Sequence, residues 1–339
     1  MIKLKKILKI FLIILTVMTI ILGIIAGIAF NYIKSKVEKV NYVPIEEGKI
    51  EINEEVQLTG YRNIALFGVD SRDDSYGKGT RSDCIIIIAL NQETNDVKLV
   101  SVYRDTYVEI EGYGLDKITH AYSYGGVELA INTLNKNMDL NISEFVVVNF
   151  EVVIDTINAL GGIEMDITAE EINYLNGYLN EIDAVQGLKT ERVKNAGKQN
   201  LNGAQALAYS RIRYTEGGDY KRTERMRDVI TAALEKAKTL SIGKINNIVN
   251  IILPKVHTNI EPTEIVTLLP QVFKYNIGNS IGWPYEVKGV TLNRWYGVPV
   301  TLESNVTKLH QEIFGEMDYV PSQTVQDINA AIVKKVGNK

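Results

Sequence analysis

Hydrophobic residues in this chain form short apolar runs that alternate with segments of helical periodicity. Apolar runs rich in β-branched residues predict buried strands at 64–69, 84–90, 97–103, 145–148 and 163–167. Helical periodicity predicts helices at 127–136, 152–160, 204–214 and 220–240. The polar stretch 91–96 reads as a hairpin turn between two of the strands. No linker or internal repeat divides this pattern, which favours one mixed α/β domain.

The N-terminus departs from this globular pattern. Residues 10–33 contain no charged side chain, and 24 residues of helix are long enough to cross a bilayer core of about 30 Å. A cleaved signal peptide is the alternative, because small residues occur at 27–29, but the apolar cores of signal peptides are usually shorter. Lysines precede the span, which indicates a cytoplasmic N-terminus and a cell-membrane location with the rest of the chain outside. The lone Cys84 agrees with export, since it leaves no intramolecular disulfide to form.

These patterns divide the chain into four predicted parts. They are a cytoplasmic tail at 1–9, a transmembrane anchor at 10–33, a polar and acidic stalk at 34–60, and a catalytic domain at 61–339. The formal net charge of −4 argues against nucleic acid as a partner. The lipid bilayer is instead the expected partner of the N-terminal helix.

The basic residues are distributed unevenly along the domain. The chain has 11 Arg and 26 Lys, yet segments 68–105 and 209–227 together hold eight Arg and three Lys. Because the planar guanidinium matches phosphate oxygens with paired donors, this enrichment indicates phosphate recognition. Arg104, at the end of a predicted strand, is a favoured site residue, whereas Arg72 and Arg227 read as surface residues in solvated ion pairs.

Aspartates accompany these arginines at strand ends, where open α/β sheets build their sites. Asp70 ends the first predicted strand and Asp83 precedes the second, so the two carboxylates could share a Mg²⁺ ion. A turn or helix-cap role is the equal alternative for each. In the second segment, Asp219, Arg222 and Arg225 are three residues apart and share a helix face. No phosphate-binding glycine loop, serine elbow or Cys/His cluster occurs, which excludes several hydrolase and NTPase classes.

Seven short blocks follow one another in a fixed order. They are GVDSR (68–72), TRSDCIII (80–87), VSVYRDTYVEI (100–110), KITHAYSYGG (117–126), LGGIEMDI (160–167), LNGAQALAYSRIRY (201–214) and GDYKRTERMRD (218–228). In these blocks, and in the apolar N-terminal span before them, the chain resembles the LytR-CpsA-Psr family. The resemblance is specific over residues 60–240 and weaker beyond. Met226 stands where the family commonly has a glutamine.

The resemblance implies an extracytoplasmic three-layer α/β/α sandwich with a mixed central sheet. It implies a phosphotransferase that moves a phosphoglycan, such as a teichoic acid or capsule-like polymer, from a polyprenyl pyrophosphate carrier to peptidoglycan. Mg²⁺, or Mn²⁺ in its place, is the implied cofactor, with Asp70 and Asp83 as its carboxylates. The residues implied to bind the pyrophosphate are Arg81, Arg104, Arg211, Arg213, Asp219, Arg222 and Arg225. Those implied to act in catalysis are Arg104, Asp83, Arg81 and Asp105, the last by orienting Arg104.

A polyprenyl tail requires an apolar cleft, for which Ile131, Val146, Val148 and Phe150 are candidates, although ordinary core packing is the more common role of such residues. Asp83 or Asp219 could accept the proton of an attacking hydroxyl. Two other functions stay open: a polyprenyl-pyrophosphate hydrolase that uses water as acceptor, and a lipid-binding regulatory module without turnover.

Overall fold

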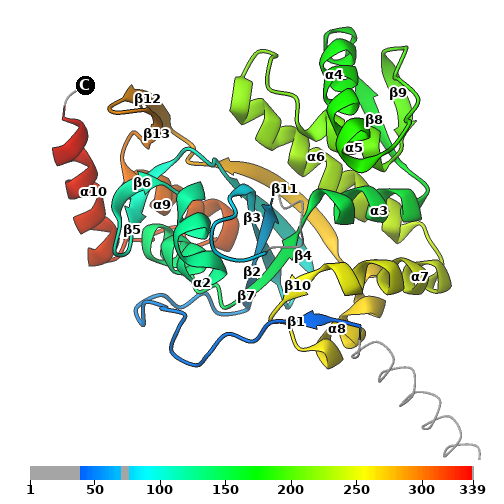
Figure 1. Ribbon diagram of the computed structural model, residues 1–339. Helices are drawn as coiled ribbons and strands as arrows, with labels where there is room; N and C mark the ends of the chain where they lie inside the picture. Colours follow the sequence, from blue (N-terminus) through cyan, green and yellow to red (C-terminus); the bar gives the residue numbers. More distant parts are fainter. Residues whose placement is uncertain (1–38, 70–75, 338–339) are drawn as a thin grey trace, which may run out of the picture.

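A seven-stranded mixed sheet forms the centre of the protein (Figure 1). The computed structural model describes residues 39–69 and 76–337. The strands, in their order across the sheet, are β1 (Asn41–Tyr42), β10 (His257–Thr258), β7 (Glu144–Val148), β2 (Tyr61–Val69), β3 (Ser82–Asn91), β4 (Asp96–Val102) and β11 (Asn276–Trp283). β2 is parallel to β7 and antiparallel to β3, and β4 is antiparallel to β3 and parallel to β11. The carboxyl ends of β2, β4, β7 and β11 therefore meet at one edge of the sheet, where β3 begins.

The two faces of the sheet pack against different helices, because alternate side chains of a strand point to opposite sides. Ala65 and Phe67 of β2 belong to a core shared with one set of helices, while Leu66 faces Ile230 on the other side. Helices of the first set are α2 (Thr119–Met138), α9 (Leu302–Leu309) and α10 (Gln323–Val336). Those on the other side are α3 (Phe150–Leu160), α6 (Gly218–Lys238), α7 (Ile242–Ile252) and the short α8 (Pro262–Leu268). The predicted mixed sheet with helices on both sides is confirmed.

A second lobe, with its own apolar core, stands beside the carboxyl edge of the sheet. It contains α4 (Ala169–Gln186), α5 (Gly203–Ser210) and a two-stranded sheet of β8 (Ile163–Ile167) and β9 (Gly197–Leu201). Its core residues, such as Leu175, Leu179 and Leu207, pack with α3, and with Val229 of α6. The strand predicted at 163–167 is therefore present, but it lies outside the central sheet. In this way α6 contacts both the lobe and the main sheet.

Two helices differ from their predicted extents for identifiable reasons. α2 begins at Thr119, before the two glycines, because Gly126 adopts φ 71° and ψ −156° and kinks the helix without ending it. α5 ends at Ser210, four residues before the predicted end, and Arg211 is its C-cap. Arg211 and Arg213 therefore lie on a loop, free of the angular spacing that a helix would impose on them.

Residues 39–60, within the segment predicted as a stalk, lie along the domain. β1 pairs with β10, and Val56 and Leu58 are buried in the main core. The Glu51 backbone N–H donates a hydrogen bond to Asn132 on α2. Among the described residues, no helix is long and apolar enough to cross a membrane. The predicted anchor at 10–33 lies outside the described residues.

Two small hairpins complete the fold near the carboxyl edge. β5 (Tyr107–Ile110) pairs with β6 (Gly114–Lys117), and β12 (Val287–Thr291) pairs with β13 (Trp295–Pro299). A bridge between Thr106 and Gly297 joins the second hairpin to the loop that follows β4. This loop carries Arg104 and Asp105, so the β12–β13 hairpin is fixed beside them.

Candidate active site

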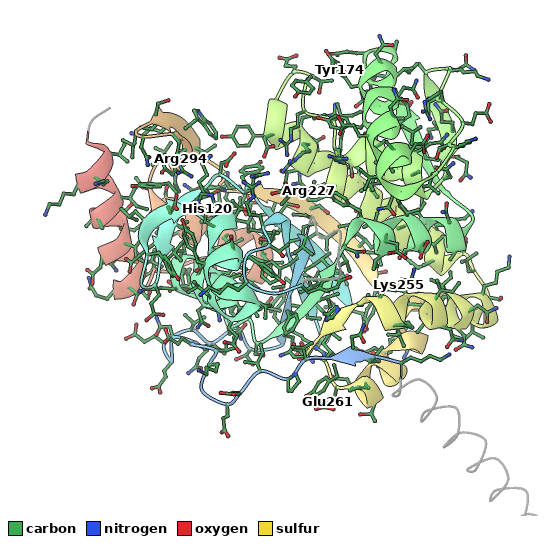
Figure 2. The ribbon with its side chains drawn as sticks, viewed as in Figure 1. His120, Tyr174, Arg227, Lys255, Glu261 and Arg294 are labelled. Carbon is green, nitrogen blue, oxygen red and sulfur yellow. The ribbon has the colours of Figure 1, made fainter. Side chains whose placement is uncertain are left out.

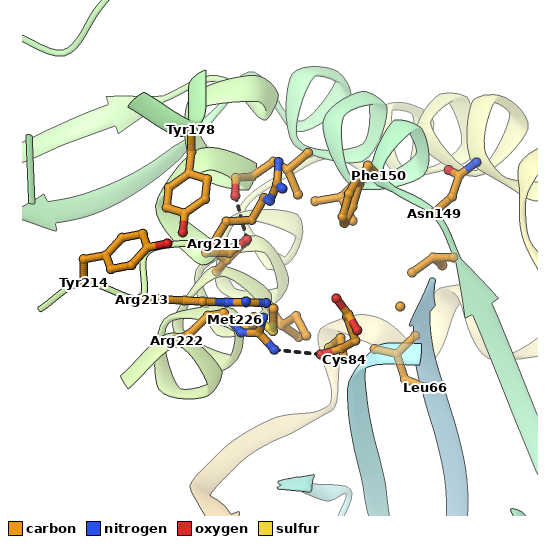
Figure 3. A pocket seen from close by; sticks show the side chains of 18 residues that line it. Leu66, Cys84, Asn149, Phe150, Tyr178, Arg211, Arg213, Tyr214, Arg222 and Met226 are labelled. Atoms are coloured by element: carbon orange, nitrogen blue, oxygen red, sulfur yellow. Dashed lines mark hydrogen bonds between the residues drawn. The ribbon is translucent and has the colours of Figure 1, made fainter. Parts of the chain in front are cut away.

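A cavity of about 340 Å³ opens where the carboxyl edge of the sheet meets α6 and the second lobe (Figure 3). Its two ends differ in chemistry. The apolar part is formed by side chains from β2, β7, α3, α5 and α6, namely Leu66, Val148, Phe150, Leu207, Met226 and Ile230. The other end is lined by Asp83, Arg211, Arg213 and Arg222. We call this cavity the arginine cavity; it matches a ligand with an apolar body and an anionic head.

The three arginines reach the cavity from separate positions. The Arg211 guanidinium lies 5.3 Å from the Phe150 ring centroid and 5.2 Å from that of Tyr178, and its Nη2 is 3.5 Å from Glu181 Oε2. Arg213 is 42% exposed at its side chain, with Nε 3.5 Å from Asp219 Oδ1. Aromatic contacts therefore orient Arg211, while Arg213 keeps most of its donors for a ligand.

Arg222 is the buried member of this group. Its side chain is 3% exposed, its Nη2 donates to the Asp83 carbonyl at 3.1 Å, and its Nε lies 3.3 Å from Asp219 Oδ1. Burial of the guanidinium between the start of β3 and the first turn of α6 fixes its position before any ligand arrives. A preorganised cation of this kind loses little conformational entropy on binding an anion.

A wall of charged side chains stands beside the arginine cavity. It is formed by residues from distant segments, namely Asp83, Arg104, Asp105 and Arg222. Arg104 Nη1 lies 2.8 Å from Asp83 Oδ1, and Arg104 Nε lies 3.9 Å from Asp105 Oδ1. Lys117 Nζ holds the same Asp105 oxygen at 2.7 Å. Three atoms of the wall, Asp83 Oδ1, Arg104 Nε and Arg222 Nε, are buried and make ion pairs but no hydrogen bond with any described residue. Buried polar atoms left in this state commonly face a ligand or an ion.

Burial also changes the acidity of groups at the site. It raises the pKa of Asp219, an effect opposed by Arg213 and Arg104 and reinforced by the carboxylates of Asp105 and Asp83. Burial raises the pKa of the Cys84 thiol, which lines the arginine cavity, to about 12. Cys84 is therefore a neutral, apolar part of the wall at physiological pH, whereas Asp219 holds its proton more readily than an exposed aspartate.

A second apolar space of about 370 Å³ lies next to the arginine cavity. Leu66 and Ile230 line both spaces, so they meet at these two side chains. On α6, Arg222, Met226, Ile230 and Leu234 recur every four residues, which places them along one stripe. Arg222 begins this stripe at the arginine cavity, and the apolar side chains of Ile230 and Leu234 line the second space. The two cavities thus adjoin each other along the same side of α6.

The structure brings several predicted residues together and separates others from the site. Of the four residues predicted to contact the lipid, Val148 and Phe150 line the arginine cavity, Val146 does not line it, and Ile131 is fully buried in the core on the opposite face of the sheet. Arg81 is exposed just before β3 and does not line the cavity. Asp70 and Arg72 lie outside the described residues.

Two arginines of α6 have positions that the sequence did not reveal. Arg225 was predicted to bind pyrophosphate, but its side chain is 2% exposed and donates to Glu171, the Ile212 carbonyl and Thr215. These contacts hold α6 against the second lobe. Arg227 was predicted to lie at the surface. It is only 9% exposed and lies in the interior of the protein (Figure 2), where burial lowers the pKa of its guanidinium.

Other site residues gave no signal in the sequence. Tyr178 and Glu181 on α4 orient Arg211, and Lys117 on β6 holds Asp105. Each of these residues belongs to another segment of the chain than the residue it contacts, and no local sequence pattern predicts such a contact. Met226 was noted as a departure from the family, and the structure places it on the apolar wall of the cavity.

The fold and site define a class: mixed α/β proteins with an apolar cavity that arginines and an aspartate also line at the carboxyl edge of the sheet. A sequence profile of the LytR_cpsA_psr family matches residues 28–295. The chain therefore belongs to the LytR-CpsA-Psr family.

Curated relatives in this family carry one activity in their names. The polyisoprenyl-teichoic acid–peptidoglycan teichoic acid transferase TagU of Oceanobacillus iheyensis is 31% identical over 277 residues, which cover 79% of this chain and 79% of that protein. The transferase TagT of Bacillus subtilis, named for the same activity, is 30% identical over 235 residues, covering 67% and 70%.

Solved structures share the fold. TagV of B. subtilis superposes with a TM-score of 0.60 at 26% identity, covering 77% of this chain and 98% of that chain. The family protein YwtF (TagT) with bound octaprenyl pyrophosphate lipid has a TM-score of 0.55 at 22% identity, covering 87% and 100%. At the latter identity the likeness is one of fold.

Proposed function

We propose that the protein is a phosphotransferase that moves a phosphoglycan from a polyprenyl pyrophosphate carrier to a sugar hydroxyl of peptidoglycan. The observation that carries this proposal is the arginine cavity, where three arginines stand beside an apolar lining that adjoins a second apolar space. The curated relatives are named for this reaction with teichoic acid. A teichoic acid or a related phosphoglycan is therefore the expected cargo.

The pyrophosphate fits the charged end of the cavity. Arg211, Arg213 and Arg222 would neutralise its oxygens, while the polyprenyl tail would follow the α6 stripe beneath Ile230 and Leu234. Fixed guanidinium groups stabilise charge on the equatorial and leaving oxygens as the transferred phosphorus changes partners. The polyprenyl phosphate would remain in the cavity as the leaving group until it dissociates.

Mg²⁺ is proposed as a cofactor on the chemistry of the donors. Asp83 Oδ1 is buried without a hydrogen bond from any described residue, and a hard carboxylate oxygen of this kind suits Mg²⁺. Asp83 would hold the ion with Asp70, which lies outside the described residues, and the rest of its ligands would come from phosphate and water. No group of three His, Cys, Asp or Glu side chains within 39–69 and 76–337 could hold a metal alone. The bound ion would add positive charge beside the phosphate oxygens.

Membrane attachment would place the site near its substrate. The uncharged stretch 10–33 is long enough to span a bilayer, with the domain on the outer surface. The anchor would raise the effective concentration of a lipid-linked donor at the domain. Peptidoglycan, the proposed acceptor, lies on the same side.

The proposal is tested with the full-length protein in detergent, a polyprenyl-pyrophosphate-linked glycan and a soluble peptidoglycan fragment, in the presence of Mg²⁺. Transfer predicts a phosphodiester-linked product and free polyprenyl phosphate in equal amounts. Release of polyprenyl phosphate with no linked product would identify a hydrolase. Tight lipid binding without either product would identify a binding module.

A further inference from the structure

A third cavity lies beyond the wall of aspartates and arginines. It has a volume of about 180 Å³ and lies between the loop after β4, the start of α6 and the β12–β13 hairpin. Its side-chain lining includes Tyr103, Asp105, Asp219, Tyr220, Val287 and Trp295. We call it the Trp295 cavity. Drug-sized ligands usually occupy about 300–1,000 Å³, so this space suits a smaller group such as one sugar ring.

The two cavities differ in the charged side chains that line them. Three arginines and one aspartate line the arginine cavity, whereas two aspartates and no basic residue among the described ones line the Trp295 cavity. Asp219 belongs to both environments, because it lines the Trp295 cavity and pairs with Arg213 and Arg222 of the other. The remaining lone pairs of these carboxylates could accept hydrogen bonds from neutral hydroxyl groups.

The Trp295 indole is held flat on its hairpin. Gly289 and Gly297 pair across β12 and β13, and a Cβ atom at Gly289 would lie 2.8 Å from the indole Nε1. Only glycine therefore leaves room for the ring in this position. The residue nevertheless stays 43% exposed, so part of the indole is accessible to a ligand.

The hairpin is also fixed relative to the carboxylates. The Gly297 N–H donates to the Asp105 carbonyl at 2.9 Å, and Tyr220 contacts Tyr103 edge to face with centroids 4.5 Å apart. Lys117, which holds Asp105, lies 6.0 Å from the Trp295 ring centroid. An exposed aromatic face and two carboxylates at fixed positions are what recognition of a sugar ring requires, since C–H groups pack on the ring face while hydroxyls donate to oxygen.

We propose that the Trp295 cavity binds the acceptor sugar, with one face of the sugar ring against the Trp295 indole and its hydroxyls toward Asp105 and Asp219. This inference rests on the proposed transferase function. The acceptor hydroxyl then reaches phosphorus across the wall between the two cavities. Its oxygen forms the new bond to the phosphorus that carries the glycan, and the bond from that phosphorus to the bridging oxygen breaks. The bonding electrons remain on the polyprenyl phosphate, and the hydroxyl proton passes to Asp219.

The first test measures sugar binding directly, using the tryptophans of the full-length protein. The chain has two tryptophans, and Trp283 is fully buried, so acrylamide quenching reports on Trp295. A soluble β-1,4-linked N-acetylhexosamine tetrasaccharide should protect the fluorescence from quenching, and Trp295→Phe should abolish this effect. Unchanged quenching at millimolar tetrasaccharide would overturn the assignment, and because the wild-type protein is used, the result does not depend on any variant folding.

The second test separates acceptor from donor. Trp295→Ala should raise the KM for a peptidoglycan acceptor at least about tenfold, as loss of a central aromatic contact usually does, and leave donor affinity unchanged. Val300→Ala, at a neighbouring residue that is 47% exposed and outside the cavity, is the matched control and should leave both unchanged. Wild-type transfer with an unchanged acceptor KM in Trp295→Ala would refute the acceptor site but keep the transferase. Protection by the tetrasaccharide without any wild-type transfer would refute the transferase but keep the sugar site.

Discussion

Arg104 and Asp83 form an ion pair with Nη1 and Oδ1 2.8 Å apart, and this pair joins the loop after β4 to the start of β3. Both residues lie at the edge of the sheet where four strands end. Their side chains are 15% and 27% exposed, so the pair is partly shielded from water, and Asp83 also lines the arginine cavity. The pair thus fixes a cation beside a carboxylate before substrate binds.

Loss of this cation should remove catalysis more than folding. Arg104→Ala should lower kcat/KM for transfer by about 10²–10³-fold, because a fixed donor to developing phosphate charge is lost. Arg104→Lys should retain only part of the activity, since a single ammonium cannot reproduce the paired donors of guanidinium. Steady-state kinetics measures both. Arg192→Ala, which removes an arginine of the second lobe, is the control; equal activity in Arg104→Ala and Arg192→Ala would contradict the role of Arg104.

The junction of the two apolar spaces should select for long polyprenyl chains. Ile230→Trp would fill the point where the arginine cavity meets the second space. Affinity for a long-chain polyprenyl pyrophosphate should then fall at least about tenfold, while a short isoprenyl pyrophosphate should bind as before. Equilibrium binding of both lipids gives the comparison. Ile251→Trp, at an exposed position of α7, should affect neither lipid; an equal loss for both chain lengths in Ile230→Trp would refute the proposed tail path.

The Arg225–Glu171 contact should contribute to stability and not to substrate affinity. Both side chains are nearly fully buried and lie 2.8 Å apart. Arg225→Met should lower the free energy of unfolding by about 3–5 kcal/mol, because Glu171 would remain buried without its partner. The double variant Arg225→Met, Glu171→Met should recover much of that loss. Denaturant unfolding measures this change. An Arg225→Met protein that is as stable as the wild type but binds pyrophosphate more weakly would contradict the stability role and support the prediction that Arg225 binds pyrophosphate.

The raised pKa of Asp219 has consequences for pH dependence. Burial is its main cause, and it places the pKa above the ordinary value of 3.8. If Asp219 accepts the hydroxyl proton, the transfer rate falls as the pH falls through this raised pKa, because the protonated carboxyl is inactive.

Stability should change in the opposite sense with pH. The folded protein holds the Asp219 proton more tightly than the unfolded chain, so the stability linked to this proton is full below pH 3.8 and is lost as the pH rises through the folded-state pKa. Asp219→Asn should remove both the acidic limb of kcat/KM and this loss of stability. An acidic limb that persists unchanged in Asp219→Asn would exclude this residue as the base.

Much of the site could be found from sequence because its residues stand at positions that strand direction alone brings together. Asp83 precedes one predicted strand and Arg104 follows the next, and in an antiparallel pair the start of one strand lies beside the end of its neighbour. The preference for arginine over lysine marked the same segments, since phosphate binding selects guanidinium. The predicted strands 84–90 and 97–103 correspond closely to β3 and β4.

The remainder depended on contacts between distant segments. Helical periodicity placed Arg222 and Arg225 on one side of α6, but it could not reveal that Glu171, 54 residues earlier, binds Arg225. Ile131 is apolar like Phe150, but the two side chains lie on opposite sides of the central sheet. Ile131 packs in the core on one side and Phe150 lines the arginine cavity on the other, a difference that the sequence pattern does not show. Trp295 gave no signal, because its position depends on the bridge between Thr106 and Gly297.

The central claim is that the arginine cavity presents a lipid-linked phosphoglycan to a sugar acceptor. The most direct measurement follows the full-length protein with a polyprenyl-pyrophosphate-linked phosphoglycan, radiolabelled in the glycan, and a peptidoglycan oligosaccharide. The account predicts that label appears on the oligosaccharide through a phosphodiester, matched by release of polyprenyl phosphate, and that Arg104→Ala abolishes both. Two results would contradict it: labelled glycan that appears only as a hydrolysis product and not on the oligosaccharide, or transfer that continues undiminished in Arg104→Ala.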